Sequence, residues 1–506
     1  MRRIYATLLA ALAFCGAHAG GYLTNTNQSA TFGRFFARQA CIGIDGAYAN
    51  PAGIGFMSDG WHLGLNMQSA VQTRTITGSF GNSTPLPFSL GAINGVQNPT
   101  DGTKKYDGKA TAPFIPSIDV AWVKGKYSLS AHFGITGGGG KCIFDNGIGT
   151  FESQVAALPL LVNSLLPAEQ VAAGMGATGY SAESYMRGRQ YYWSSQVNFG
   201  LKINPKLVVS AGLRVAWASN NYYGYVRNIS VNVAGQSYLA SDLLTAQGMP
   251  HLAALATDKA LNCDQTGFGL TPILAIDWKS GKWNLSARWE MKTRMRLKNK
   301  SGNNTSGIAE FDDGKKIPAD LPPIIFGGVQ YSILPTLRVA LGGTYYVDRK
   351  ATQYEHREEL LRSDGVELLA GIEWDINDWA TISGGGQYTN YGLGTDSKFI
   401  TNLSFVTDSY SLGCGAKFKL SEKMALEVSY FKTFYMHYTK HMDDYNDVKS
   451  TLSGGVSQLA ASGVLNEAEL AAVQKIAPAI ASYSTAGIDR FDRTNDVLGI
   501  ALDIDF

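Results

Sequence analysis

Residues 283–298 constrain the fold more than any other stretch, because they alternate in polarity over about 16 residues. The odd positions are apolar or nearly so, and the even positions are polar. A period of two places these sets on opposite faces of a β-strand. Strands of soluble proteins usually run about 3–10 residues, whereas a membrane-crossing strand turns one set toward lipid and the other toward a lumen. The pattern therefore predicts an outer-membrane barrel with a charged interior.

Similar alternating segments recur along the chain, joined by connections that are short at every second position and long at the others. Outer-membrane barrels have this asymmetry, with short periplasmic turns and long external loops. We therefore expect an all-β fold, a 14-stranded antiparallel transmembrane β-barrel spanning residues 60–506. The expected strands are 61–77, 112–123, 127–137, 187–203, 207–227, 266–278, 282–298, 323–332, 336–348, 366–376, 379–391, 409–420, 424–437 and 497–506.

The first 19 residues have the parts of a secretory signal peptide: two arginines, an apolar run and an Ala-His-Ala cleavage site. Export would place the four remaining cysteines in an oxidising compartment, where Cys142 and Cys263 could pair or stay free. The mature chain has no apolar run of about 18 residues, which excludes a helical membrane protein. Net charge is +2, so composition makes no case for nucleic-acid binding.

Three long insertions, residues 153–173, 238–262 and 450–482, have helical rather than alternating patterns and are expected in external loops. Residues 20–59 show no sustained alternation. The third strand ends in Gly137, Gly138, Gly139 and Gly140, a run that weakens regular pairing and favours a bend. The final residue, Phe506, ends an alternating strand. Bacterial barrels commonly finish with such a strand, which the assembly machinery recognises.

Three features make the chain similar to the FadL family of outer-membrane transporters for long-chain fatty acids and related hydrophobic compounds. The first is Phe32-Gly33-Arg34 followed by Asn50-Pro51-Ala52 before the first strand; the others are Ala112-Pro113-Phe114-Ile115-Pro116-Ser117 and the 14-strand layout ending in Phe506. The resemblance implies that residues 20–59 form a hatch plugging the lumen. It also implies a kink in the third strand, at Gly137–Gly140, that opens sideways into the bilayer.

A carboxylate substrate would need arginine or lysine partners inside the barrel. The candidates are Arg34 in the hatch and the lumen-phase residues Arg214, Arg288, Arg294 and Arg338; equally, they could pair with Asp119, Asp277, Glu290, Glu367 or Glu373 as a structural network. Phe32, Phe35 and Phe36 could contact an acyl chain or anchor the hatch. Leu158, Leu160, Leu161, Leu165 and Leu166 could form a capture groove or pack together as a cap.

The alternatives from other functional classes are a lipid-modifying enzyme and an adhesin. A lipid-modifying enzyme would need Ser and His within hydrogen-bond reach, and the sequence has no compact motif for it; His132 reads as a hydrogen-bonded filler of the lumen. An adhesin would use the external loops. A metal site at His437, His441, Asp443 and Asp444 would require a local helical turn.

We therefore expect a non-enzymatic, monomeric transporter without cofactor or metal in the outer membrane of a Gram-negative bacterium. Its partners would be the hydrophobic substrate, membrane lipids and the barrel assembly machinery. The first alternative is a channel of the same fold for aromatic hydrocarbons or other small apolar solutes.

Overall fold

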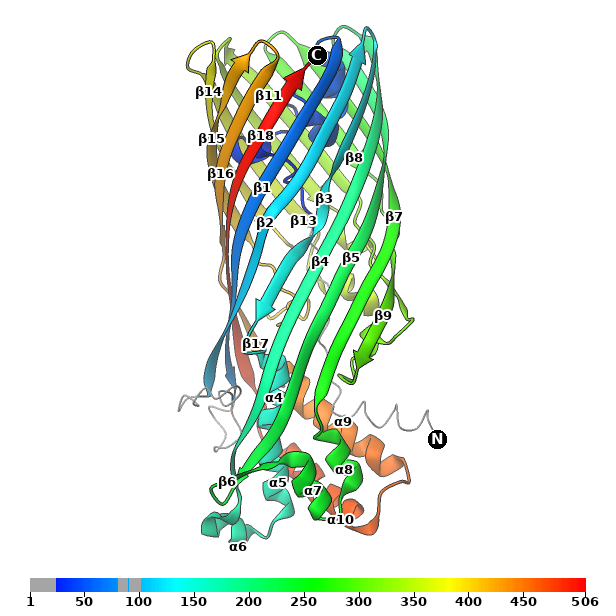
Figure 1. Cartoon of the computed structure of the whole chain (residues 1–506), viewed down its shortest axis with the longest axis vertical. Helices are drawn as coiled ribbons and strands as arrows, with labels where there is room; N and C mark the ends of the chain where they lie inside the picture. Colours follow the sequence, from blue (N-terminus) through cyan, green and yellow to red (C-terminus); the bar gives the residue numbers. More distant parts are fainter. Residues whose placement is uncertain (1–23, 81–89, 91–101) are drawn as a thin grey trace.

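The computed structural model is a closed antiparallel barrel with helices gathered at one end (Figure 1). It describes residues 24–80, 90 and 102–506, so the expected signal peptide lies outside the described residues. The last strand, β18 (Gly487–Asp505), pairs with the first, β1 (Gly60–Phe80), over 19 residue pairs from His62–Asp505 to Phe80–Gly487. This pairing closes the sheet, and the expected 14-stranded barrel is confirmed.

The wall follows the chain, each strand pairing with the next one across a hairpin or loop. In order, the wall strands are β1, β2 (Thr103–Lys124), β3 (Tyr127–Phe144), β4 (Ala177–Asn204), β5 (Leu207–Val233), β7 (Lys259–Ser280), β8 (Trp283–Glu290), β11 (Ile324–Leu334), β12 (Leu337–Tyr346), β13 (Gly365–Asp375), β14 (Ala380–Asn390), β15 (Ser409–Ser421), β16 (Met424–Tyr435) and β18. Four short strands extend or flank them: β6 (Gln236–Leu239), β9 (Arg296–Asn304), β10 (Lys316–Pro318) and β17 (Tyr438–Met442).

The two faces of each strand differ in polarity, as the alternation predicts. On β7, Trp278, Ile276 and Leu274 point outward and are 40–46% exposed. Between them Asp277 is fully buried inside the barrel. Apolar side chains exposed all round the outside are stable only against lipid, because water would have to hydrate them at a cost of about 25 cal/mol per Å².

The long alternating stretch is not one strand, which corrects the expectation for residues 283–298. β8 ends at Glu290, and regular structure resumes only at Arg296 in β9. The irregular residues between them invert the alternation, so Arg288 and Glu290 point inward but Arg294 and Arg296 point outward. The predicted direction of the side chains, inward or outward, is therefore correct for β8 and inverted in the residues beyond it.

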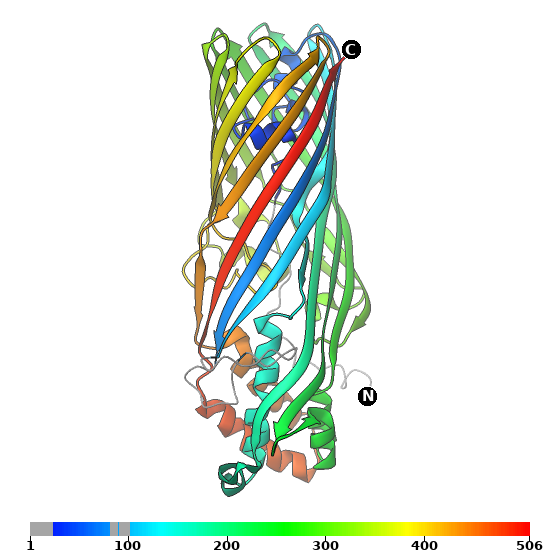
Figure 2. The ribbon, with the colours of Figure 1, turned by 60° about the vertical axis from the view of Figure 1, so that its left-hand side comes forward.

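Several strands are longer than the sequence pattern suggested. β4 and β5 run 28 and 27 residues, whereas crossing the hydrocarbon takes about 9–11. The extra length extends the barrel wall toward the helices at the end with the long loops (Figure 2). Outward positions in these extensions include polar residues such as Thr178, Ser181 and Glu183, so the alternation that marks the membrane portions is weaker there.

The three insertions form helices at the far end of the extended wall, as expected (Figure 1). They are α4 (Gly149–Ala156), α5 (Leu158–Leu165) and α6 (Ala168–Gln170), then α7 (Ala240–Ala246) and α8 (Pro250–Leu255), and finally α9 (Val448–Ala461) and α10 (Glu467–Ser482). Among the described residues no single helix has the length and apolarity needed to span a membrane; one pair bent by 118°, Gly149–Leu165 with Ala168–Met175, passes by length and composition only.

The described part of the N-terminal segment, residues 24–59, lies inside the barrel toward the end with short turns (Figure 2). It contains α2 (Ala30–Arg34), α3 (Gly46–Ala49) and a 3₁₀ turn, η2 (Gly53–Phe56). Ser29 caps α2 by accepting a hydrogen bond of 3.1 Å from the Phe32 backbone N–H. Gly33 permits the close approach of α2 to the wall, because a Cβ there would lie 2.8 Å from the Ser429 hydroxyl.

Candidate functional site

The hydrogen-bond ladder between β2 and β3 is interrupted in mid-wall. Pairing stops at Ile118–Phe133 and resumes only at Ala110–Cys142. β2 carries Pro113 and Pro116 in this interval, and proline has no backbone N–H to donate. The expected weakness at the glycine run is thus present, and prolines on the facing strand contribute to it.

The glycine run bends β3 without ending it, which differs from the expected end at residue 137. Gly138 and Gly140 have φ values of +97° and +71°, and the register with β4 shifts on both sides of Gly137. The strand then continues to Phe144. A Cβ on Gly138 would lie 2.4 Å from the backbone oxygen of Gln190, so only glycine fits there.

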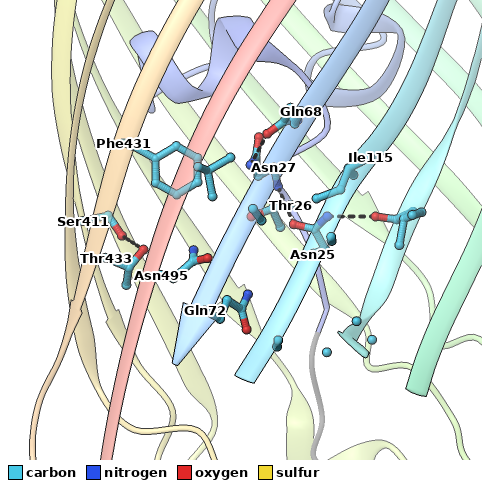
Figure 3. Close-up of a pocket in the computed structure, with 18 of the residues that line it drawn as sticks. Asn25, Thr26, Asn27, Gln68, Gln72, Ile115, Ser411, Phe431, Thr433 and Asn495 are labelled. Atoms are coloured by element: carbon cyan, nitrogen blue, oxygen red, sulfur yellow. Dashed lines mark hydrogen bonds between the residues drawn. The ribbon is translucent and has the colours of Figure 1, made fainter. Parts of the chain in front are cut away.

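A cavity of about 200 Å³ lies between the N-terminal segment and this interruption. Its apolar wall includes Phe32, Ile115 and Phe431. In Figure 3, Thr26 lies in the middle of the site, with Phe431, Thr433 and Asn495 on one side and Ile115 on the other. Gly138, Gly139 and Gly140 also line the cavity, so it adjoins the gap in the wall.

The N-terminal segment is fastened at this cavity by amides. The Asn25 side chain donates to the Ile135 carbonyl at 2.9 Å, and Asn27 donates to the Gln68 side chain at 2.7 Å (Figure 3). Thr24 forms an isolated bridge with Gly137 at the start of the glycine run. The segment that enters the barrel therefore contacts the bend directly.

Two buried arginines lie beside the cavity without an acidic counter-charge. Arg74 and Arg493 are directly opposed on β1 and β18, and each is 7–8% exposed. Arg74 donates to the Gly139 carbonyl at 3.0 Å, and Arg493, which lines the cavity, donates to Gln72 at 3.0 Å. Within the described residues, neither has a carboxylate within ion-pair distance, and the Nε and Nη1 atoms of Arg493 have no hydrogen-bond partner.

Such an arrangement is costly on its own. Like charges directly opposed across strands destabilise a sheet, and a buried donor left unsatisfied costs about 1–3 kcal/mol. Glu367 also lines the cavity, but its oxygens accept from the Tyr346 hydroxyl at 2.7 Å and the Gln387 amide at 2.8 Å. The free guanidinium donors of Arg493 are therefore suited to an anion entering the cavity.

The sequence did not point to Arg493, because the expected last strand began at residue 497. The alternation in fact extends further back, with Phe491, Arg493, Asn495 and Val497 all buried on the inward face. Extending the period-two pattern across these positions was the signal that could have found it.

The arginines selected from the sequence are placed elsewhere, and four of them, Arg34, Arg214, Arg288 and Arg338, form ion pairs within the lumen. Arg34 contacts Glu373 and pairs with Glu427 at 2.8 Å. Arg214 binds Glu290 at 2.6 Å, and Arg338 binds Asp375 at 2.7 Å. These contacts match the structural alternative for Arg34, Arg214 and Arg338.

Arg288 and Arg294 differ from these three. Arg288 is 3.3 Å from Glu290 but mainly supports the plug, since it donates to the Tyr48 carbonyl and lies over the Tyr48 ring. Arg294 is on the outer surface, so its expected lumen position is wrong, because the irregular segment after Glu290 inverts the phase.

The three hatch phenylalanines divide between the two roles considered. Phe32 lines the cavity, whereas Phe35 and Phe36 are fully buried among plug and wall side chains. Phe36 packs edge-on against Phe431 with ring centroids 5.6 Å apart. Phe32 is thus placed to contact a ligand, and Phe35 and Phe36 are placed to anchor α2.

The Asn-Pro-Ala motif joins the plug to the wall. The Asn50 amide donates to Asp277 on β7 and accepts from the Gly53 N–H at 3.2 Å. Pro51 and Ala52 are buried beside it. Phe506, 66% exposed, donates its backbone N–H to Trp61 at 2.9 Å at the seam between the last and first strands.

The external leucines are part of a helical cluster. Leu158 and Leu160 are buried, and Leu161 and Leu165 pack against the cluster made with α7, α8, α9 and α10. These helices enclose a small apolar cavity of about 50 Å³. The packing matches the expected cap more closely than an open groove.

The other sequence hypotheses do not converge on a reactive centre. His132 is held by Asp119 at 2.8 Å and Gln28 at 3.2 Å, as expected for a lumen filler. His437 contacts Asp492 while His441 contacts Asp396, so the structure does not bring the proposed metal ligands together. Among the residues described, one group has metal-ligand spacing: His356, Glu358 and Glu359, of which two are exposed.

All cysteines in the described part of the chain are free, so the alternative of a Cys142–Cys263 disulfide is not realised. Cys142 lies at the end of β3 and Cys263 on β7, on strands that are not neighbours.

These features define a class: a 14-stranded barrel with an N-terminal plug, a broken wall ladder and a cavity between the two. The chain has the fold of a Pseudomonas aeruginosa FadL homologue, with a TM-score of 0.63 at 13% identity over 96% of this chain and 100% of that one. The resemblance seen in the sequence is confirmed for the fold.

Further matches have lower TM-scores. The P. putida toluene transporter TodX has a TM-score of 0.49 at 12% identity, covering 92% of this chain and 94% of its own. The Ralstonia pickettii toluene transporter TbuX has a TM-score of 0.48 at 12% identity, covering 95% of this chain and 100% of its own. No protein-family model and no curated protein matches the sequence.

Proposed function

We propose that this protein is a non-enzymatic outer-membrane channel for passive uptake of long-chain fatty acids, with release sideways through the gap between β2 and β3. The fold supports uptake of a hydrophobic solute, since the plug occupies the lumen and the ladder between β2 and β3 is interrupted beside it. The observation that carries the substrate assignment is Arg493, a buried cation that lines the cavity and has two guanidinium nitrogens without a hydrogen-bond partner.

A fatty acid fits both parts of this site. Its carboxylate would accept charge-assisted hydrogen bonds from Arg493, each worth about 1.5–3 kcal/mol. Its chain would lie against Phe32, Ile115 and Phe431, where each buried CH₂ contributes about 0.8 kcal/mol. The cavity holds only part of a long chain, so the remainder would extend through the gap beside Gly138–Gly140.

The sideways route has a physical advantage for such a solute. The polar headgroups of the outer membrane oppose direct entry of an apolar chain, and an axial exit would deliver it into water. Leaving through the wall would take the chain from the cavity to the bilayer without a passage through the periplasm. The plug is fixed by Arg34, Asn50 and the amides near Asn25, so it need not leave the barrel.

A channel for aromatic hydrocarbons is the second candidate, because the apolar side of the cavity, formed by Phe32, Ile115 and Phe431, would also admit them. Arg493 distinguishes the two, since an uncharged hydrocarbon leaves its donors unsatisfied. The enzyme and adhesin hypotheses gain no support from this site, because a cavity beside an interrupted wall suits the passage of a solute. Location in the outer membrane, a monomeric state and recognition of the last strand by the assembly machinery are part of the same proposal.

The test compares two ligands with the same chain and different headgroups, oleate and oleyl alcohol. Arg493→Gln should weaken oleate binding to purified protein about tenfold and leave oleyl alcohol within about twofold. Arg490→Gln is the matched control, because Arg490 is on the same strand but exposed outside the barrel. Uptake of labelled oleate by cells lacking their own importer should follow the same order.

Equal loss for both ligands would show that Arg493 only shapes the cavity. No loss for either ligand would remove the headgroup assignment and leave the hydrocarbon channel as the better reading. Release of acyl chains from lipids incubated with the protein would instead establish an enzyme.

A further inference from the structure

The outer face of the barrel has a sharp polarity boundary beside β7. Trp193, Trp217 and Phe268 pair in one cross-strand row on β4, β5 and β7. Below this row, toward the short turns, the outward positions of β7 are apolar; above it they are polar, beginning with Thr266. Aromatic rows of this kind mark the membrane–water interface of barrels.

The height of the row agrees with this placement. Phe268 is about 12 residues from the short turn after Ser280, which at about 3.3 Å per residue and a tilt of about 40° is roughly 30 Å. The apolar band of a barrel is about 25 Å tall. The row therefore lies at the outer edge of the bilayer, on the side of the long loops.

Basic side chains gather at the same height on the outside of the neighbouring strand. The phase inversion after Glu290 turns Arg294, Arg296 and Lys298 outward, and all three are exposed. Lys298 pairs in register with Thr266 at the polarity boundary, and the Arg296 and Arg294 backbones lie beside Gly267 and Gly269, level with the aromatic row and just below it. Lys300 and Lys316 extend the basic surface away from the membrane.

Few acids neutralise this group. Asp320, itself nearly buried, lies 3.3 Å from Arg296 and 3.2 Å from Lys292. Asp264 faces Lys300 across the ladder but accepts from Asn221 at 2.9 Å. Of the residues described, no acid is within ion-pair distance of Arg294 or Lys298. The local balance is strongly positive on a face that abuts lipid.

A groove runs along the outside between the aromatic row and the cations. Its lining includes Trp193, Trp217 and Phe268 on one side and Arg294, Met295 and Arg296 on the other. Its open volume is about 1060 Å³, and it lies where the irregular segment between β8 and β9 interrupts regular pairing. The groove lining therefore combines three aromatic side chains with two exposed arginines.

We propose that this groove binds a phosphorylated glycolipid of the outer leaflet, with an acyl chain against the aromatic row and headgroup phosphates on Arg294, Arg296 and Lys298. Guanidinium and ammonium groups bind phosphate by charge-assisted hydrogen bonds, and the aromatic side chains beside them offer an apolar surface to an acyl chain. The site is separate from the cavity at Arg493 and rests on the proposed function only for the outer-membrane location.

The test uses delipidated, full-length protein in detergent, titrated with diphosphoryl lipid A and followed by native mass spectrometry. Arg294→Gln/Arg296→Gln/Lys298→Gln should weaken lipid A binding at least tenfold. Lys124→Gln/Lys126→Gln/Lys206→Gln removes the same charge from the exposed turns at the opposite end and should change it less than twofold. Dephosphorylated lipid A should bind the parent protein as weakly as lipid A binds the first variant.

Retention of lipid A affinity in the first variant, or equal loss in the second, would overturn the proposal. Displacement of lipid A by millimolar inorganic phosphate would show that phosphate alone suffices and would overturn the acyl-chain part. Arg294→Gln alone, which removes one exposed cation without an ion-pair partner in the described chain, should weaken binding about threefold if the triple variant fails to fold. Oleate binding should stay unchanged throughout, which separates this result from a failure of the transport proposal.

Discussion

Removing Arg34 should loosen the plug while leaving the barrel folded. Its guanidinium lies between two carboxylates, Glu427 at 2.8 Å and Glu373, and also donates to Ser383 at 2.9 Å. Removing one partner of a buried ion pair typically lowers stability by about 3–5 kcal/mol, since the remaining charge is left uncompensated. Lys417 stays 3.0 Å from Glu427 and Arg338 stays 2.9 Å from Glu373, so the lower end, about 3 kcal/mol, is expected for Arg34→Met.

Hydrogen exchange measures this cost locally. A change of about 3 kcal/mol is roughly a 100-fold change in an opening equilibrium. The Phe35 and Arg38 amides, which donate to plug carbonyls at 2.8–3.1 Å, should exchange roughly 100-fold faster, with wall amides unchanged. Arg34→Met with Glu427→Gln and Glu373→Gln should recover most of the protection. Unchanged plug exchange, or loss of protection throughout the wall, would refute the assignment of Arg34 as the local anchor.

Three further predictions concern the gap, the plug motif and a buried acid. Gly138→Val should lower oleate uptake more than tenfold, because the new Cβ would clash with the Gln190 backbone. Gly327→Ala is the control and should leave uptake unchanged, because a Cβ there meets open space. Equal uptake by the two variants would show that the bend is dispensable. Asn50→Ala should alter oleate uptake without abolishing barrel assembly, because it removes the link to Asp277; unchanged uptake would count against a plug role. Burial raises the pKa of Asp348, in the loop after β12, to about 7. Its contribution to stability is therefore present below about pH 4 and is lost as pH rises to about 7, and Asp348→Asn should flatten that part of a chemical-denaturation pH profile; an unchanged slope would contradict it.

The fold was predictable because the lipid-facing and lumen-facing residues alternate wherever a strand crosses the bilayer. The pattern failed where the chain leaves that environment. β4 and β5 continue far beyond the membrane, and there the outward face no longer has to be apolar. The prediction for the segment after Glu290 failed for a different reason: an irregularly paired stretch can change the face on which a side chain lies without changing the sequence pattern.

The site was less predictable than the fold. The position of an arginine in the period-two alternation shows that its side chain enters the lumen. It does not show which of these arginines forms an ion pair with a carboxylate. Arg34, Arg214 and Arg338 find one, and Arg493 does not, because its strand neighbour is Arg74. That difference depends on which strands close the barrel, and only the three-dimensional structure shows it.

The most direct test is a crystal structure of the protein with oleate bound. We expect a carboxylate within hydrogen-bond distance of Arg493, with the chain passing Phe32 and Ile115 toward the gap at Gly138–Gly140. A chain held only among the external helices, or in the lumen on the side of Arg34 and Arg338, would contradict it.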